Sequence, residues 1–165
     1  MVAAMSRRPL PLEDHLFVSI LKLADSLSQE AEVVIKSAGL TPAQYNVLRI
    51  LRGAEPEGLL CRGIAERMLS RDPDMTRLLD RMEKHGWITR QRQQDDRRVI
   101  KTRITPEGLK LLKKLEQPVH DLHKDQFRHI PAVRLKLLAE LVAEVRKREP
   151  FRFAAHQKWS SRPEH

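Results

Sequence analysis

The spacing of the apolar residues changes at Gly86, and this change limits the folds open to the chain more than any other feature. Before Gly86, the segment "PDMTRLLDRMEKHG" repeats its apolar residues at intervals of three and four, which is the period of a helix. After it, "WITRQRQ" and "RVIKTRI" alternate apolar and polar residues on either side of the polar segment "QDDR". That alternation predicts two strands joined as a hairpin, directly after a short helix.

The segment before this helix contains further helix start signals. In "LTPAQYNVLRILRG", Thr41 is the expected cap, Pro42 takes the first helical position and Gln44 completes a capping box. The segment "LLCRGIAERML" predicts a short third helix, and Asp72 as cap with Pro73 as first residue marks the start of the next one. Short helices in this order, followed by a hairpin, predict a winged helix-turn-helix.

Longer amphipathic helices are expected on both sides of this lobe. The N-terminal one runs from Leu12 to just before Gly39, and two C-terminal ones begin at Pro106 and near Pro131, the last ending before Pro150. Their apolar faces are larger than a small central lobe can cover, and isolated amphipathic helices are unstable without a partner. We therefore expect these helices to form the interface of a homodimer.

Charge narrows the choice of partner. The 31 Lys and Arg outnumber the 22 Asp and Glu, which gives a formal net charge of +9. Such an excess is typical of proteins that bind polyanions, above all nucleic acid. Much of it lies between Lys84 and Arg103, in and beside the hairpin, where two acids, Asp95 and Asp96, accompany seven basic residues: Lys84, Arg90, Arg92, Arg97, Arg98, Lys101 and Arg103. The alternative is a solvated hairpin whose charges only protect an edge strand from aggregation.

The chain is therefore expected to be mainly α, with a winged helix-turn-helix, a two-stranded wing, and a helical dimerisation region formed by the N- and C-terminal helices. A length of 165 residues suits this organisation. The expected segments are a flexible basic arm (1–11), an N-terminal dimerisation helix (12–38), a DNA-binding lobe (41–104), C-terminal dimerisation helices (105–148) and a tail of unassigned role (149–165).

The tip of the wing combines acids with arginines. In "DDRR", Asp96 stands two residues before Arg98, on the same face of an extended tip. A carboxylate in that place can orient the guanidinium, and an oriented Arg gains from the negative potential of a narrow minor groove. We expect Arg98 to enter the minor groove with Asp96 orienting it, while Arg97 and Arg92 bind phosphates.

The helix before the hairpin is expected to enter the major groove. Two polar residues lie in its first turn, and two arginines stack at a spacing of four, opposite its apolar face. An Arg there reads a guanine edge or binds a phosphate, and the sequence leaves both roles open. The candidates for DNA contact from the helix pair are Arg62, Asp74, Met75, Thr76, Arg77 and Arg81. The alternative is that the arginines are ordinary exposed charges paired with Asp80 and Glu83.

These residues resemble the MarR family of dimeric winged helix-turn-helix transcription regulators, from about Leu12 to Arg148. The wing signature, Asp-x-Arg followed after five residues by an apolar residue and Thr, is present here as Asp96, Arg98, Ile104 and Thr105. The resemblance implies that the terminal helices form the dimer interface and that small phenolic or carboxylate ligands, or oxidants, release the protein from its operator. The third helix departs from the family pattern, because Leu60, Cys61 and Arg62 stand where a Ser or Thr cap is usual.

An effector pocket is expected between the dimer bundle and the DNA-binding lobe. Polar groups that could line it are His15, Ser19, Tyr45 and Arg49. A small aromatic or acidic effector suits these side chains. The alternative, which we prefer, is that they are ordinary polar residues of an interface.

Two further candidates are weaker. Cys61, near a helix N-terminus and beside Arg62, has the surroundings of a redox switch, but a structural role is favoured because the chain has no second Cys. The segment "HDLHKDQFRH" contains His120, His123 and His129, which could bind a metal. A solvated helix face is favoured for them, and we expect no metal and no cofactor.

The sequence thus predicts a non-enzymatic transcription regulator, a homodimeric repressor that binds a pseudo-palindromic operator in double-stranded DNA. It contains no nucleophile with its base and no phosphate-binding glycine loop. It also lacks an apolar run of membrane-spanning length and the apolar stretch of a signal peptide, so we expect a cytoplasmic protein without membrane contact. The alternatives are a winged-helix interaction or architectural protein with little sequence preference, and a metal-dependent hydrolase built on the His cluster.

Overall fold

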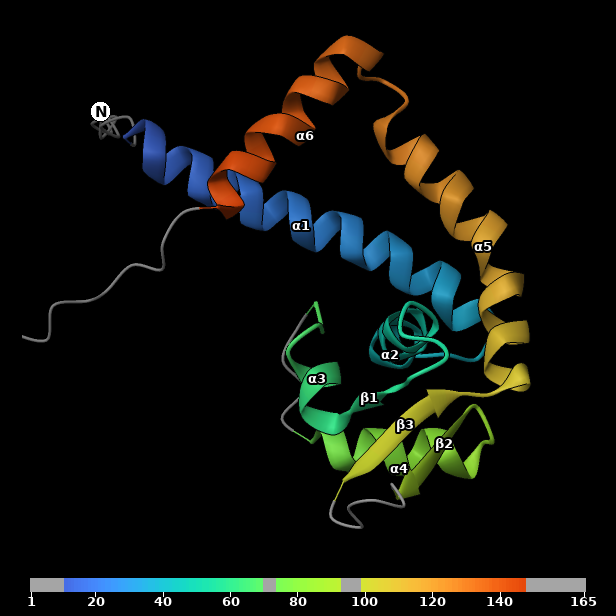
Figure 1. Ribbon diagram of the computed structural model, residues 1–165. Helices are drawn as coiled ribbons and strands as arrows, with labels where there is room; N and C mark the ends of the chain where they lie inside the picture. Colours follow the sequence, from blue (N-terminus) through green and yellow to red (C-terminus); the bar gives the residue numbers. More distant parts are fainter. Residues whose placement is uncertain (1–10, 70–73, 93–98, 148–165) are drawn as a thin grey trace, which may run out of the picture. The chain divides into compact units, whose positions relative to one another are not determined.

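The computed structural model describes residues 11–69, 74–92 and 99–147, which form a mainly helical protein with one small sheet (Figure 1). The chain divides into two compact units, Met1–Gln126 and Phe127–His165. The elements are, in chain order, α1 (Leu12–Ser37), α2 (Pro42–Arg52), β1 (Leu59–Leu60), α3 (Cys61–Ala65), α4 (Met75–Lys84), β2 (Ile88–Arg92), β3 (Ile100–Ile104), α5 (Pro106–Phe127) and α6 (Ala132–Arg146).

The predicted hairpin is confirmed as β2 and β3, which pair antiparallel with Ile88 opposite Ile104. A strand that the sequence did not predict, β1, lies on the other side of β3 with Leu59 opposite Thr102. Two residues are too few to show an alternation, so this strand has no signal of its own in the sequence. The wing is the outer part of a three-stranded sheet, in the order β1-β3-β2, rather than a separate two-stranded hairpin.

Side-chain caps begin α2 and α5 where the sequence predicts. Thr41 Oγ1 accepts a hydrogen bond from Gln44 N at 3.2 Å, and Gln44 Oε1 accepts one from Thr41 N at 2.9 Å, so the capping box is confirmed. At the start of α5, Thr105 Oγ1 accepts from Gly108 N at 3.1 Å and donates to Gly86 O at 2.6 Å. The Thr105 hydroxyl thus joins the start of α5 to the turn that follows α4.

The start of α4 differs from the prediction. Its cap is Asp74, whose Oδ1 accepts a hydrogen bond from Arg77 N at 3.2 Å, and its first residue is Met75. The predicted cap and first residue, Asp72 and Pro73, lie outside the described residues. The sequence offers two Asp residues close together as caps, and local spacing does not distinguish them.

The hydrophobic core belongs to the first unit. Its members come from the end of α1 and the turn after it, from α2, α3, α4 and the sheet, and from α5 as far as Val119. They are Ile35, Leu40, Val47, Leu48, Leu51, Ile64, Met75, Leu78, Leu79, Met82, Ile88, Ile104, Leu112, Leu115 and Val119. Because α4 buries one side in this core, its position relative to the sheet is fixed by packing.

Two glycines allow close approaches around the sheet. Gly58 has a φ of +69°, and a Cβ at this position would lie 2.5 Å from Thr102 O, so β1 meets β3 only without a side chain here. Gly108 lies at the start of α5, where a Cβ would collide with Trp87 O and the Ile104 side chain. Both glycines are therefore required by the packing of the sheet against its neighbours.

Large apolar surfaces remain exposed on α1 and α6 within one chain. The exposed apolar residues in the first half of α1 are Leu12, Leu16, Phe17, Val18, Ile20, Leu21 and Leu23. Helix α6 buries none of its residues and exposes Val133, Leu137, Leu138, Leu141, Val142 and Val145. None of the described helices combines the length and the apolar character needed to cross a membrane.

Candidate nucleic-acid interface

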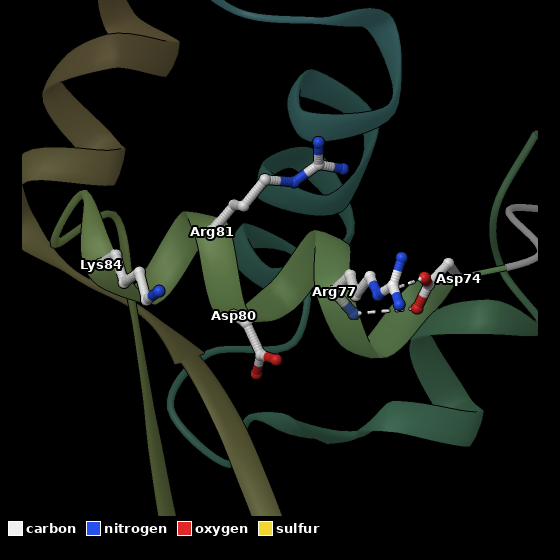
Figure 2. Close-up of a pocket in the computed structure, with 5 residues that line it drawn as sticks. All are labelled: Asp74, Arg77, Asp80, Arg81 and Lys84. Carbon is white, nitrogen blue, oxygen red and sulfur yellow. Dashed lines mark hydrogen bonds and ion pairs between the residues drawn. The ribbon is translucent and has the colours of Figure 1, made fainter.

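The outward face of α4 is the main candidate surface. The apolar side of the helix points into the core, so Thr76, Arg77, Arg81 and Lys84 are exposed on the other side. A pocket on this face is lined by Asp74, Arg77, Asp80, Arg81 and Lys84 (Figure 2). A helix face with three cations is suited to the phosphates and base edges of DNA.

Asp74 holds Arg77 in one direction. Its Oδ2 lies 3.0 Å from Arg77 Nε, and the Arg77 side chain is still 82% exposed. An arginine that is oriented by a carboxylate and open to solvent is prepared for a contact with a base or a phosphate. One turn later, Arg81 pairs with no carboxylate in the described part of the chain, and Figure 2 shows its side chain extending away from Asp80.

The acids of α4 bind an arginine of the sheet. Arg90, on β2, places Nε 2.8 Å from Glu83 Oε2 and Nη2 2.5 Å from Asp80 Oδ1. Its Nη2 also lies 2.7 Å from Glu83 Oε2, and its backbone N–H donates to Glu83 Oε1 at 2.9 Å. Hydrogen bonding to Glu83 raises the pKa of Arg90, although partial burial opposes the rise.

This arrangement contradicts the alternative that the exposed arginines of α4 pair with Asp80 and Glu83. Asp80 and Glu83 pair with Arg90 and not with the arginines of α4. Arg90 is therefore not one of the free cations of the wing, although its charge counts toward the excess there. The sequence contains no clear signal for this pairing, because the partners lie on opposite sides of the turn at Gly86 and meet only when β2 packs against α4.

Two cations at the base of the wing differ in how they are held. Arg92 is exposed at the end of β2 and has no ion pair within the described ranges. Arg103, on β3, donates to Pro56 O at 3.0 Å and to Gln91 Oε1 at 3.1 Å. The tip candidates Asp96, Arg97 and Arg98 lie outside the described residues.

The remaining candidates for DNA contact differ in exposure. Met75 is only 8% exposed and packs in the core with the apolar face of α4, so its side chain offers little surface for the predicted DNA contact. Arg62, on α3, is 89% exposed and pairs with Glu66 at 2.8 Å. Cys61 is exposed as the first residue of α3, a helix of five residues without a side-chain cap.

The four candidates for an effector pocket lie on two different helices, α1 and α2. On α2, the guanidinium of Arg49 lies 5.8 Å from the centre of the Tyr45 ring. His15 and Ser19 lie on the exposed first half of α1, whereas contact with the core begins near Ala31. The stretch of helix from His15 to Ala31 spans about 24 Å at the usual rise per residue. One chain therefore does not bring the four together.

The histidines near the end of α5 lie on the surface. His120, His123 and His129 are all exposed. Across the described ranges, no group of three or more His, Cys, Asp or Glu side chains is arranged to hold a metal ion.

Comparisons with known proteins agree with this architecture. A sequence profile of the MarR family matches residues 40–100. A MarR transcription factor from Planctomyces limnophilus, solved by crystallography, is 36% identical with a TM-score of 0.63, and the match covers 83% of this chain and 99% of that one. The homoprotocatechuate degradative operon repressor of Escherichia coli is 24% identical over 81% of this chain and 88% of its own length. A point mutant of MarR from E. coli, crystallised with operator DNA, has a TM-score of 0.72 at 22% identity, covering 82% and 99%.

Proposed function

Since the chain belongs to the MarR family of transcription regulators, we propose that it is a homodimeric repressor that binds a pseudo-palindromic operator and leaves it when a small ligand or an oxidant acts. The coarser part of this description, a DNA-binding regulator of transcription, follows from the family. The repressor role is supported by the name of the E. coli relative, an operon repressor. We also propose a cytoplasmic location and no catalytic activity, since the relatives are named as regulators.

One observation carries the proposed DNA binding. Helix α4 buries its apolar side and presents Arg77, Arg81 and Lys84 outward, directly before the hairpin of β2 and β3. This is the order in which a recognition helix and a wing follow each other. In the proposed complex, α4 enters the major groove, and Arg62 and Arg92 contact the flanking backbone. The E. coli relative crystallised with operator DNA has the same fold.

The exposed apolar faces of α1 and α6 support the proposed homodimer. Each face exposes at least six large apolar side chains within one chain, and such faces are rarely left in contact with water. A two-fold dimer would present two copies of α4 to half-sites about one helical turn, or about 10 bp, apart.

The direct test is selection of an operator. The purified protein would be used to select duplexes from a random library, and the selected duplex would be examined by footprinting and fluorescence anisotropy. We expect an inverted repeat, protection of both halves, and a preference over bulk DNA of about 10³ or more at fixed salt. Equal affinity for the selected duplex and for bulk DNA would favour an architectural protein instead.

The tip of the wing carries a separate prediction. We propose that Arg98 enters the minor groove, that Asp96 orients it, and that Arg97 binds a phosphate. Replacement of Asp96 by Ala should then weaken binding to the selected duplex, although it removes a negative charge that repels DNA. Tighter binding of D96A in the anisotropy assay would contradict this role.

For the effector, the Tyr45–Arg49 pair favours an aromatic acid, because an aromatic ring and a guanidinium lie together on α2. Benzoate and phenol are suitable probes, and we expect benzoate to release the DNA at lower concentration than phenol. Arg49→Met should remove that difference. An oxidant would act through Cys61, so Cys61→Ser should abolish release by peroxide if the thiol is the sensor.

A further inference from the structure

The ion-pair cluster of Arg90, Asp80 and Glu83, here called the Arg90 cluster, connects the two elements that the proposed function assigns to different grooves of DNA. Asp80 and Glu83 belong to α4, the proposed recognition helix, and Arg90 belongs to β2, the first strand of the wing. A protein that contacts two grooves at once gains most when both contacting elements are already in position before binding. The relative position of α4 and the wing is therefore a property on which affinity depends.

Glu83 holds Arg90 through both its side chain and its main chain. One carboxylate oxygen accepts from the Arg90 backbone N–H at 2.9 Å, and the other accepts from Nε at 2.8 Å. The backbone bond matters because β2 is an edge strand of the described sheet, with only β3 beside it. An edge strand leaves a row of N–H groups without strand partners, and Glu83 satisfies one of them. The contact thus fixes the strand itself, not only a side chain on its surface.

The geometry leaves Arg90 poorly placed for direct contact with DNA. Its side chain is 26% exposed, against 82% for Arg77 on the candidate surface. Its Nε and Nη2 are both engaged by carboxylates. Two residues further along β2, Arg92 provides the contrast: it is exposed, and no ion pair holds it within the described ranges.

We propose that Arg90 is a positioning residue, which sets the wing relative to the recognition helix by binding Asp80 and Glu83, and so determines DNA affinity without touching DNA. This inference rests on the proposed function. It also assigns a use to two acids that lie beside the cations of α4, where acids alone would repel phosphates.

The first test compares two lysine substitutions of arginines that pair with a carboxylate, one in the Arg90 cluster and one on α2. Lysine keeps the positive charge of arginine but lacks the planar fork that reaches two carboxylates at once. We expect R90K to weaken Kd for the selected duplex by at least about tenfold, because the cluster loses its geometry. R52K changes an arginine that pairs with Glu116 and that has no part in the proposed DNA contacts, so it should leave Kd within about twofold. Affinity of R90K equal to that of the unmodified protein would overturn the proposal.

The second test separates positioning from simple charge. E83Q removes a negative charge close to the DNA-binding face, so a purely electrostatic account predicts tighter binding. Positioning predicts binding weaker by at least about threefold, because the Nε contact is lost. E57Q removes an exposed acid outside the cluster and serves as the matched control, with Kd unchanged or slightly lower. Tighter binding of the selected duplex by E83Q would contradict the inference.

A double-mutant cycle completes the design. R90M should cost at least about tenfold in Kd in the unmodified chain, but less than about threefold in a chain that already carries D80N and E83Q. An equal cost in both backgrounds would mean that Arg90 contacts DNA directly. Circular dichroism and thermal unfolding check that each variant is folded, and the isosteric E83Q remains decisive if the Arg90 variants unfold. If the unmodified protein selects no duplex, the proposed function itself fails, and that result is distinguishable from a failure of the variants.

Discussion

At the scale of single residues, Asp74 combines a helix cap and an ion pair in one carboxylate. One oxygen caps α4 by accepting from Arg77 N, and the other orients the guanidinium of the same residue. The local stability of α4, the proposed recognition helix, and the direction of its first arginine therefore depend on the same side chain.

Replacement of Asp74 tests these contacts separately. D74A removes the cap and should lower the free energy of unfolding by about 1 kcal/mol, whereas D74N, which keeps a good cap, should lower it by only a few tenths. Both variants lose the ion pair with Arg77, so both should bind the selected duplex more weakly although a negative charge is gone. Urea denaturation measures the first effect and fluorescence anisotropy the second. If D74N bound more tightly, the carboxylate would only repel DNA and would not prepare Arg77.

At the scale of elements, α5 packs closely against the hairpin because Gly108 has no side chain. A Cβ at Gly108 would meet the Trp87 carbonyl and Ile104, and Leu48 Cδ2 lies 3.2 Å from the same point. The Thr105 hydroxyl joins this junction to Gly86. The start of α5 is thus held on the sheet by a close backbone approach and a hydrogen bond.

Gly108→Ala should therefore destabilise the protein by about 1 to 3 kcal/mol, the usual cost of forcing extra volume into a packed site. Gly53→Ala is the matched control, because Gly53 has a φ of −71° and a Cβ there would have only ordinary contacts, at 3.6 and 3.7 Å. We expect the control to lie within about 0.5 kcal/mol of the unmodified chain. Equal unfolding midpoints in urea for the two variants would show that the junction can adapt.

Local signals predicted most of the elements, and contacts between elements limited the rest. The capping box of Thr41 and Gln44 and the period change at Gly86 act within a few residues, so the sequence displays them directly. Strand β1 is stabilised by pairing with β3, a segment about forty residues away, and its two residues carry no pattern.

At the candidate site, too, local signals predicted some features, and contacts between elements determined the others. The exposed arginines of α4 follow from its helical period, but Met75 shares the first turn with Arg77 and packs inward. The partner of Arg90 depends on how β2 lies against α4, which no spacing in the sequence encodes. His15 and Tyr45 are both polar candidates for the effector pocket. However, His15 lies on the exposed first half of α1, whereas Tyr45 packs against the core from α2.

At the scale of the whole molecule, the apolar residues are divided between two uses. The buried ones, which lie between Ile35 and Val119, form the core of the first unit, whereas most of those on α6 and on the first half of α1 stay exposed within the chain. The core thus maintains the lobe that carries α4 and the wing, and the exposed faces are available for the proposed dimer.

Charged substitutions on α1 test that use. Leu16 and Ile20 lie one turn apart, at 51% and 46% exposure. Their double replacement by Asp should leave the core intact, yield a monomer in light scattering, and weaken operator binding by at least about a hundredfold, because only one half-site is then held. Lys22→Glu, also on α1 and exposed, is the control and should remain dimeric. A dimeric double variant would rule out this face as the interface.

The absence of any buried residue in α6 has a consequence for how the regulator responds to its own abundance. In the proposed dimer, a helix that buries none of its residues in one chain gains its packing from the second chain. On the proposed assembly, operator occupancy at low copy number would rise with about the second power of the number of chains per cell, because pairing must come first. Halving the synthesis of the protein would then lower operator occupancy by more than half. Modest dilution of the protein during growth could therefore change expression sharply.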